Sequence, residues 1–234
     1  MCIPQSVEEI LDVTGLSLER LYQILGRDTY DSSIFKLSDQ KHMRFCELFD
    51  RLEAARRSSS KSVKGEALER IVGFLLESLG VYRVLRNRRT STNEIDVLLL
   101  KNHGFDYIDA ERFPRTIMCE CKNYGGSVSV TYIGKFFALA HMANCKLGLM
   151  FSYKPISGRN NWVDGKGMCR KIALRSNTFI INITYSDLML IRDKNVSIMR
   201  IIDDKRMALE NDIDIQCEQH ELCHDAQFVN ADIG

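Results

Sequence analysis

The chain has 234 residues, of which 45% are hydrophobic and three are prolines, and its formal net charge is +1. This composition predicts a folded protein with a sizeable core and excludes disordered and collagen-like chains. With no apolar run of about 18 residues and no basic-then-apolar N-terminal signal, we expect a soluble, cytoplasmic protein with reduced thiols and no membrane contact.

The first 60 residues are predicted to form a helical region. Ser6 and Glu9 fit a capping box before one helix, and a second helix follows Gly15. The order loosely resembles a helix-turn-helix unit, but a small helical bundle without a DNA role is the favoured interpretation. A third helix is expected over residues 39–57, before a serine-rich linker.

From residue 64 to about residue 200 the pattern alternates between helices and strands. This alternation predicts an α/β domain in which helices cover a central sheet. We expect helices over residues 65–79, 130–145 and 165–175, the last capped by Asp164, and strands over residues 82–85, 94–100, 116–122, 147–152 and 178–184. Residues 87–93 are expected to form a polar loop.

Charge is distributed unevenly along the chain. Residues 65–202 carry 20 basic and 12 acidic residues, whereas residues 203–234 carry 2 basic and 9 acidic. A basic middle favours a polyanionic partner such as nucleic acid, although solvated surface charge explains part of it. The tail, residues 203–234, is expected to be solvated and disordered; an alternative is that it folds over a basic cleft. Zinc binding by Cys217, His220, Cys223 and His224 is a weaker alternative for this tail.

The stretch "TIMCECK" places two pairs of residues on opposite faces of one predicted strand. Glu120 and Lys122 point to one side, and Cys119 and Cys121 point to the other, because side chains alternate along a strand. The two thiols are expected to pack as small hydrophobes. The charged pair therefore carries the chemistry.

Asp96 is a lone carboxylate inside the apolar run "IDVLLL", so it needs a partner or a site. If its strand lies beside that of Glu120, the two carboxylates meet. Such hard oxygen ligands suit Mg²⁺ or Mn²⁺, and the backbone carbonyl of Cys121 offers a third ligand. Lys122 would then stabilise charge at an attacked phosphorus. The alternative is an Asp–Lys ion pair with a purely structural role.

A third carboxylate lies on the helix that precedes the Asp96 strand. Glu69 is flanked by core leucines and is the preferred candidate for the same metal, with Glu66 as the alternative.

In their order, "KGEALER", "NEIDVLLL", "MCECKNYGGSV" and "LGLMFS" resemble the PD-(D/E)xK nuclease superfamily, most closely the Mrr-like restriction endonucleases, over residues 64–185. The resemblance implies a restriction-endonuclease-like core and Mg²⁺-dependent DNA cleavage in restriction or repair. It places Asp96, Glu120 and Lys122 at the motif positions and Glu69 at the acidic position of the leading helix. Ile95 stands where the motif has proline.

DNA contacts are expected from basic segments around this core, since arginine and lysine bind phosphate oxygens. The candidates are Arg86, Arg88, Arg89, Lys135, Lys166, Arg170 and Lys171. An ordinary solvated helix face is the alternative for those on the later helix. A homodimer would suit double-strand cleavage, and a catalytically inactive nucleic-acid-binding or regulatory module is the alternative function.

Overall fold

In the computed structural model, the described residues are 35–89, 94–105, 112–122, 126–158 and 164–211. The predictions for the first two helices, for the possible zinc ligands and for most of the acidic tail therefore lie outside the described residues.

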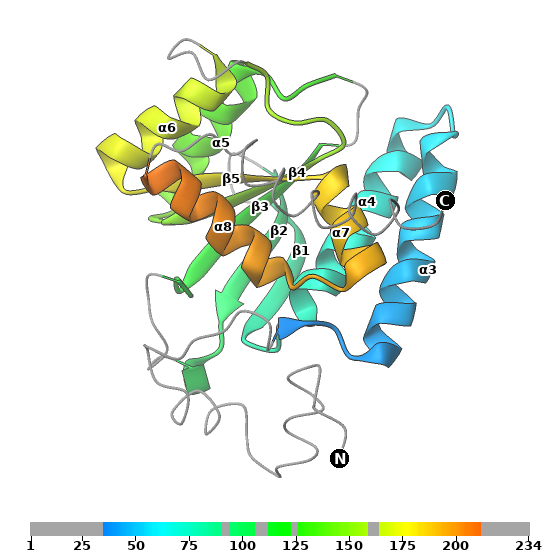
Figure 1. Cartoon of the computed structure of the whole chain (residues 1–234). Coiled ribbons are helices and arrows are strands. Elements are labelled where there is room, and N and C mark those ends of the chain that lie inside the picture. The colour runs from blue at the N-terminus through cyan, green and yellow to red at the C-terminus, as the bar shows by residue number, and fades with distance from the viewer. Residues whose placement is uncertain (1–34, 90–93, 106–111, 123–125, 159–163, 212–234) are drawn as a thin grey trace, which may run out of the picture.

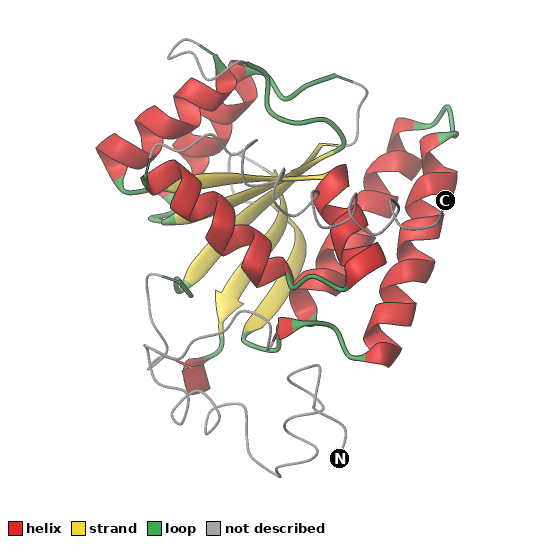
Figure 2. Ribbon diagram, in the orientation of Figure 1, coloured by secondary structure: helices red, strands yellow, loops and turns green. Residues whose placement is uncertain are grey.

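Five strands form one mixed sheet whose spatial order follows the chain (Figures 1 and 2). Three of them, β1, β2 and β3, pair antiparallel, whereas β3, β4 and β5 pair parallel. The strands are β1 (Tyr82–Arg89), β2 (Glu94–Lys101), β3 (Thr116–Lys122), β4 (Leu147–Ser152) and β5 (Phe179–Thr184). Every residue of β4 is buried, as expected of a parallel strand whose two faces are both covered.

Helices α5 (Val130–Met142) and α6 (Gly165–Ser176) connect the parallel strands. Right-handed crossovers between successive parallel strands place both helices on one face of the sheet. Gly148 of β4 permits the close approach of α5, because a Cβ there would lie 2.7 Å from the Phe136 ring. Asp164 caps α6 by accepting a hydrogen bond from the Gly167 amide at 2.8 Å, as predicted.

Helix α4 (Lys61–Glu77) packs on the strands β1, β2 and β3. Its buried residues recur at helical spacing and include Leu68, Ile71 and Leu75. Gly73 faces Arg86 of β1 so closely that a Cβ would lie 2.4 Å from the guanidinium Nε.

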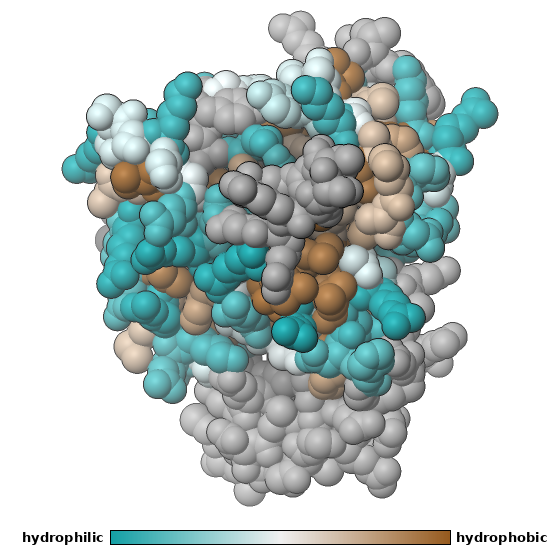
Figure 3. Space-filling view, turned by 180° about the vertical axis from the view of Figure 1, so that it is seen from behind, coloured by the Kyte–Doolittle hydropathy of each residue, from teal (hydrophilic) through white to brown (hydrophobic). Residues whose placement is uncertain are grey.

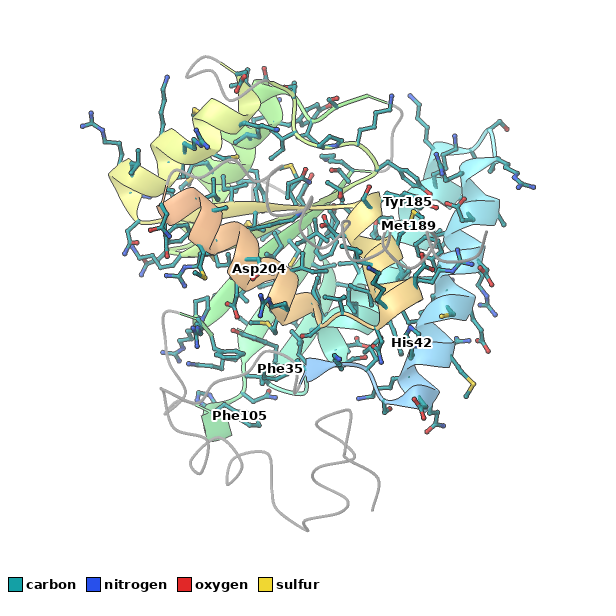
Figure 4. All side chains as sticks on the ribbon, in the orientation of Figure 1. Phe35, His42, Phe105, Tyr185, Met189 and Asp204 are labelled. Carbon is teal, nitrogen blue, oxygen red and sulfur yellow. The ribbon has the colours of Figure 1, made fainter. Side chains whose placement is uncertain are left out.

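Helix α3 (Asp39–Arg56) packs against α4 and against α7 (Tyr185–Lys194). His42 of α3 lies beside the end of α7, where its Nε2 is 3.0 Å from the Ile191 carbonyl (Figure 4). At the other end of the contact, the rings of Tyr153 and Tyr185 stack 4.9 Å apart, and the Arg56 guanidinium lies 4.2 Å from the Tyr153 ring. The α3 helix is thus held to segments that follow β4 and β5.

Helix α8 (Ile198–Glu210) lies against β5 and α6. Lys205 donates hydrogen bonds to the Asn182 carbonyl of β5 at 2.8 Å and to the buried Asp187 carboxylate at 2.5 Å. Asp187 also accepts from the amide and the hydroxyl of Thr184. The ammonium group of Lys205 therefore binds an edge carbonyl of the sheet and neutralises a buried charge.

The mixed sheet with its flanking helices confirms the predicted α/β fold class. Two expectations about elements were wrong. Strand β1 continues to Arg89, through the start of the predicted polar loop, and residues 203–210, assigned to the tail, belong to α8. In addition, helices α7 and α8 were not predicted.

The surface of the described residues is largely polar when the molecule is seen from behind (Figure 3). Apolar residues gather near the centre of that view, next to residues outside the described part. Within the described segments, no helix combines the length and apolarity needed to cross a membrane.

Replacing Lys205 by methionine should destabilise the protein, because it leaves the Asp187 carboxylate buried without its cation. We expect the free energy of unfolding in urea to fall by about 3 kcal/mol. Arg200→Met is the matched control on the same helix: Arg200 pairs with Asp204 at 2.9 Å on the exposed side of α8 (Asp204 is labelled in Figure 4), so a loss below about 1 kcal/mol is expected. Equal losses in the two variants would contradict this assignment.

Candidate active site

The antiparallel pairing of β2 with β3 stops just before a pair of carboxylates. Val97 opposite Cys119 is the last pair in register, so Asp96 and Glu120 are the next residues on either strand. The Cys121 amide instead donates to Asp96 Oδ2 at 2.7 Å. A side chain thus replaces the main-chain partner where the two strands separate.

Glu120 and Lys122 lie on the face of the sheet that α5 covers. Both side chains are about one-fifth exposed, and the Lys122 ammonium contacts the Glu120 carboxylate directly. Lys122 Nζ also lies 5.2 Å from the centre of the Tyr132 ring on α5. An aromatic ring at that distance attracts an ammonium group, so Tyr132 and Glu120 hold Lys122 from two sides.

The pKa of the Glu120 carboxyl is raised above its ordinary value. Burial is the main cause, and the negative charge of Asp96 adds to it, while the Lys122 ammonium acts in the opposite direction. The Lys122 ammonium therefore does not fully offset the effects of burial and of the Asp96 charge on the Glu120 carboxylate. A further cation near Asp96 and Glu120 would favour the ionised form.

The charges that act on the Cys121 thiol include that of a third carboxylate, Glu69. Burial above all raises the pKa of the thiol well above the ordinary value, and the charges of Asp96, Glu69 and Glu120 raise it further. Glu69 on α4 is therefore close enough to act on the same stretch of β3. Glu66, the alternative, is exposed and pairs with Arg70 at 2.6 Å, which favours Glu69.

The two cysteines of β3 occupy the predicted opposite face. Cys119 is fully buried in the core, and Cys121 is half-buried against it. Burial raises the pKa of both thiols well above the ordinary value, which keeps them protonated and unreactive at neutral pH. The thiols are therefore packing residues, as the alternation indicated.

The donor chemistry at this strand end fits Mg²⁺ or Mn²⁺. The Asp96 and Glu120 carboxylates are hard oxygen ligands. The Cys121 carbonyl lies on the same side of β3 as the amide that reaches Asp96, since the N–H and C=O of one strand residue point to the same neighbour. In the described part of the chain, no three side chains of His, Cys, Asp or Glu form a group that could hold a metal ion, so metal binding by Asp96, Glu120, Cys121 and Glu69 stays a prediction.

The predicted DNA contacts fall on two sides of the sheet. Arg86 packs on α4 and pairs with Glu77 at 2.8 Å, which gives it a structural role. Lys135 is exposed on α5, on the side of the sheet that bears Glu120. On α6, Lys166, Arg170 and Lys171 are partly exposed. Arg88 and Arg89 lie in β1, but their side chains are outside the description. Phosphate binding by all seven residues stays a prediction.

Residues 60–158 match a protein family described as "Restriction endonuclease", the Mrr-type catalytic domain. The matched segment runs from the start of α4 past the end of β4 and includes Glu69, Asp96, Glu120 and Lys122. The predicted resemblance to the Mrr-like restriction endonucleases is confirmed for this segment.

No curated protein sequence matches the chain. A solved structure titled "DNA modification-dependent restriction endonuclease AspBHI" is similar, with a TM-score of 0.40 and 14% sequence identity over 79% of this chain. The chain spans 43% of the length of that structure.

Replacing Glu120 by glutamine should stabilise the metal-free protein at neutral pH. Because the pKa of Glu120 is higher in the folded protein, its contribution to stability is lost as the pH rises through that pKa, and glutamine mimics the protonated form. Urea unfolding in a chelating buffer should show a higher free energy of unfolding for Glu120→Gln. The gain should vanish at acid pH, where the native carboxyl is protonated. Exposed Glu66→Gln is the control, and a gain that is independent of pH would contradict the assignment.

Proposed function

We propose that the protein is a metal-dependent endonuclease that hydrolyses DNA phosphodiester bonds, with Asp96, Glu120 and Lys122 as its catalytic centre. The observation that supports this most directly is the strand end itself. Two carboxylates and a lysine gather where β2 and β3 separate, and the Cys121 amide fixes one of the carboxylates. The match of residues 60–158 to a restriction endonuclease family supports the same reaction.

The metal would be Mg²⁺ or Mn²⁺, held by Asp96, Glu120 and the Cys121 carbonyl, with Glu69 contributing from α4. When bound, such an ion supplies a Lewis acid and lowers the pKa of coordinated water. Of the protein groups, the Cys121 amide orients the Asp96 carboxylate, and Glu120 keeps the Lys122 ammonium at the strand end. Lys122 then stabilises negative charge that develops on the attacked phosphate, because its ammonium donates hydrogen bonds to the phosphate oxygens.

DNA would approach the face that carries α5 and α6. Lys135, Lys166, Arg170 and Lys171 lie on these two helices, and their charges suit phosphate oxygens. Arg86 contributes less to this surface because Glu77 already neutralises it. A homodimer would supply the two centres that double-strand cleavage requires. A role in DNA restriction or defence, in the cytoplasm, is consistent with these features.

Plasmid nicking should depend on the proposed centre. With Mg²⁺ or Mn²⁺ present, Asp96→Ala, Lys122→Ala and Glu69→Gln should each slow nicking at least about 100-fold, because each removes a group aimed at the phosphate or the metal. Glu66→Gln, the same change one turn away on α4, should leave the rate unchanged.

The outcome of this series separates enzyme from binding module. Nicking at an unchanged rate in both Asp96→Ala and Lys122→Ala would contradict the assignment of these residues to the catalytic centre. DNA binding in gel shifts without nicking, across metals and substrates, would favour the catalytically inactive module instead.

Tyr132 is expected to position Lys122 through its ring rather than its hydroxyl. Tyr132→Leu removes the ring from the ammonium and should lower kcat about fivefold, with KM little changed. Tyr132→Phe keeps the ring and should retain the native kcat. A loss in the phenylalanine variant, or a change confined to KM, would show instead that the phenol group contacts DNA.

A further inference from the structure

A cavity of about 160 Å³ opens between α6, α8 and the end of β5. Its lining includes apolar residues such as Ile156, Ile180 and Cys169 and the basic residues Lys166, Arg170 and Lys205. None of the proposed catalytic residues lines it. The cavity is therefore a second feature of the α5 and α6 side of the molecule, distinct from the strand end that bears Glu120.

Lys205, in the lining of the cavity, holds a buried proton donor that the described part of the chain does not satisfy. The Lys205 side chain is 10% exposed and uses two of its three ammonium protons, for the Asn182 carbonyl and for Asp187. The third proton has no acceptor among the described residues. A buried donor without an acceptor is costly, which favours a ligand that carries acceptor oxygens.

The volume sets the size of such a ligand. An engineered apolar cavity of about 150 Å³ in another protein accommodates benzene, so about 160 Å³ suits one six-membered ring. A pyrimidine base has this size, and its ring carbonyls are acceptors that an inner ammonium such as that of Lys205 can bind. The apolar lining residues would contact the ring. Lys166 and Arg170, both partly exposed on α6, would bind an attached phosphate group.

The position of the cavity relates it to the proposed cleavage centre. Lys122, Ser152 and Thr184 are in register on the adjacent strands β3, β4 and β5, and Thr184 lines the cavity. Two strand spacings separate Lys122 from Thr184, which is roughly 10 Å. Successive nucleotides of one DNA strand rise about 3.4 Å, so this distance spans about three nucleotides. Residues in register point to the same face, so the cavity and Lys122 are reached from one side.

We propose that this cavity binds a pyrimidine nucleotide, with the base between α6 and α8 and the phosphate at Lys166 and Arg170. This inference rests on the proposed nuclease function: we take the nucleotide to be a unit of the DNA strand that is turned out of the duplex near the cleaved bond. A free nucleoside monophosphate has the same chemistry and is the other possible source. Extrusion costs a few kcal/mol of stacking and pairing, which the base contacts offset.

The first experiment uses free nucleotides and does not depend on cleavage. Calorimetric titration of the full-length protein with dCMP or dTMP should show saturable binding, tighter than for dAMP, whereas inorganic phosphate or the nucleoside alone should bind much more weakly. The double variant Lys166→Gln/Arg170→Gln should weaken dCMP binding at least about tenfold.

Lys146→Gln/Arg175→Gln is the matched control, because it removes two positive charges from exposed positions outside the cavity lining. It should change the affinity for dCMP less than about twofold. Absence of saturable binding of any nucleotide, tighter binding of dAMP than of dCMP, or equal weakening in the two double variants would each overturn the proposal.

The second experiment asks whether DNA supplies the nucleotide. In a complex with duplex DNA and Ca²⁺ in place of Mg²⁺, permanganate should oxidise an unstacked thymine on the bound strand, and the Lys166→Gln/Arg170→Gln variant should abolish this reactivity. Nucleotide binding without permanganate reactivity would overturn the DNA source and assign the site to free nucleotides. Nucleotide binding in a protein that never nicks plasmid would overturn the nuclease function and leave the cavity assignment standing.

Discussion

The rest of the site depends on where β2 and β3 stop pairing. Continued pairing would place Asp96 directly opposite Glu120, and like charges directly opposite one another destabilise an antiparallel pair. The strands instead separate after Val97 and Cys119, and Asp96 accepts the Cys121 amide that the broken ladder leaves without a main-chain partner. One constraint therefore ends the ladder and orients a carboxylate at the point where two acidic side chains meet.

The parallel strands β4 and β5 lie beside β3 and continue the edge of the sheet at which Glu120 and Lys122 lie. Because β3, β4 and β5 run in the same direction, their carboxyl ends lie together, and ligands of such sheets commonly bind outside those ends. Lys122 and Thr184 thus belong to one edge although 62 positions separate them in the chain. The charged strand end and the cavity beside α6 thus lie along the same edge of the sheet.

Local signals made much of this predictable, and long-range contacts decided the rest. Strand β3 was predicted to the residue because its side chains alternate, and the pairing of Asp96 with the Glu120 strand followed from the cost of burying a lone carboxylate. Helix α7 was missed because Thr184 both ends β5 and caps the helix without a break. Helix α8 was missed because Asp203 and Lys205 made its sequence look like a charged tail. Lys205 is buried only because Asp187 lies opposite, a contact that spacing does not reveal.

The N-terminal helix α3 is joined to the same edge through Tyr153. This tyrosine lines the cavity and donates its hydroxyl hydrogen bond to Glu53 of α3 at 2.9 Å. Burial alone would raise the pKa of Glu53, but hydrogen bonds from Tyr153, Tyr185 and Arg56 outweigh it and lower that pKa, which keeps Glu53 ionised as an acceptor. The wall of the cavity is therefore held in place by α3, outside the matched family segment. A partner that displaces α3 would therefore act on the cavity through Tyr153, and also on α4, which packs against β3 and bears Glu69.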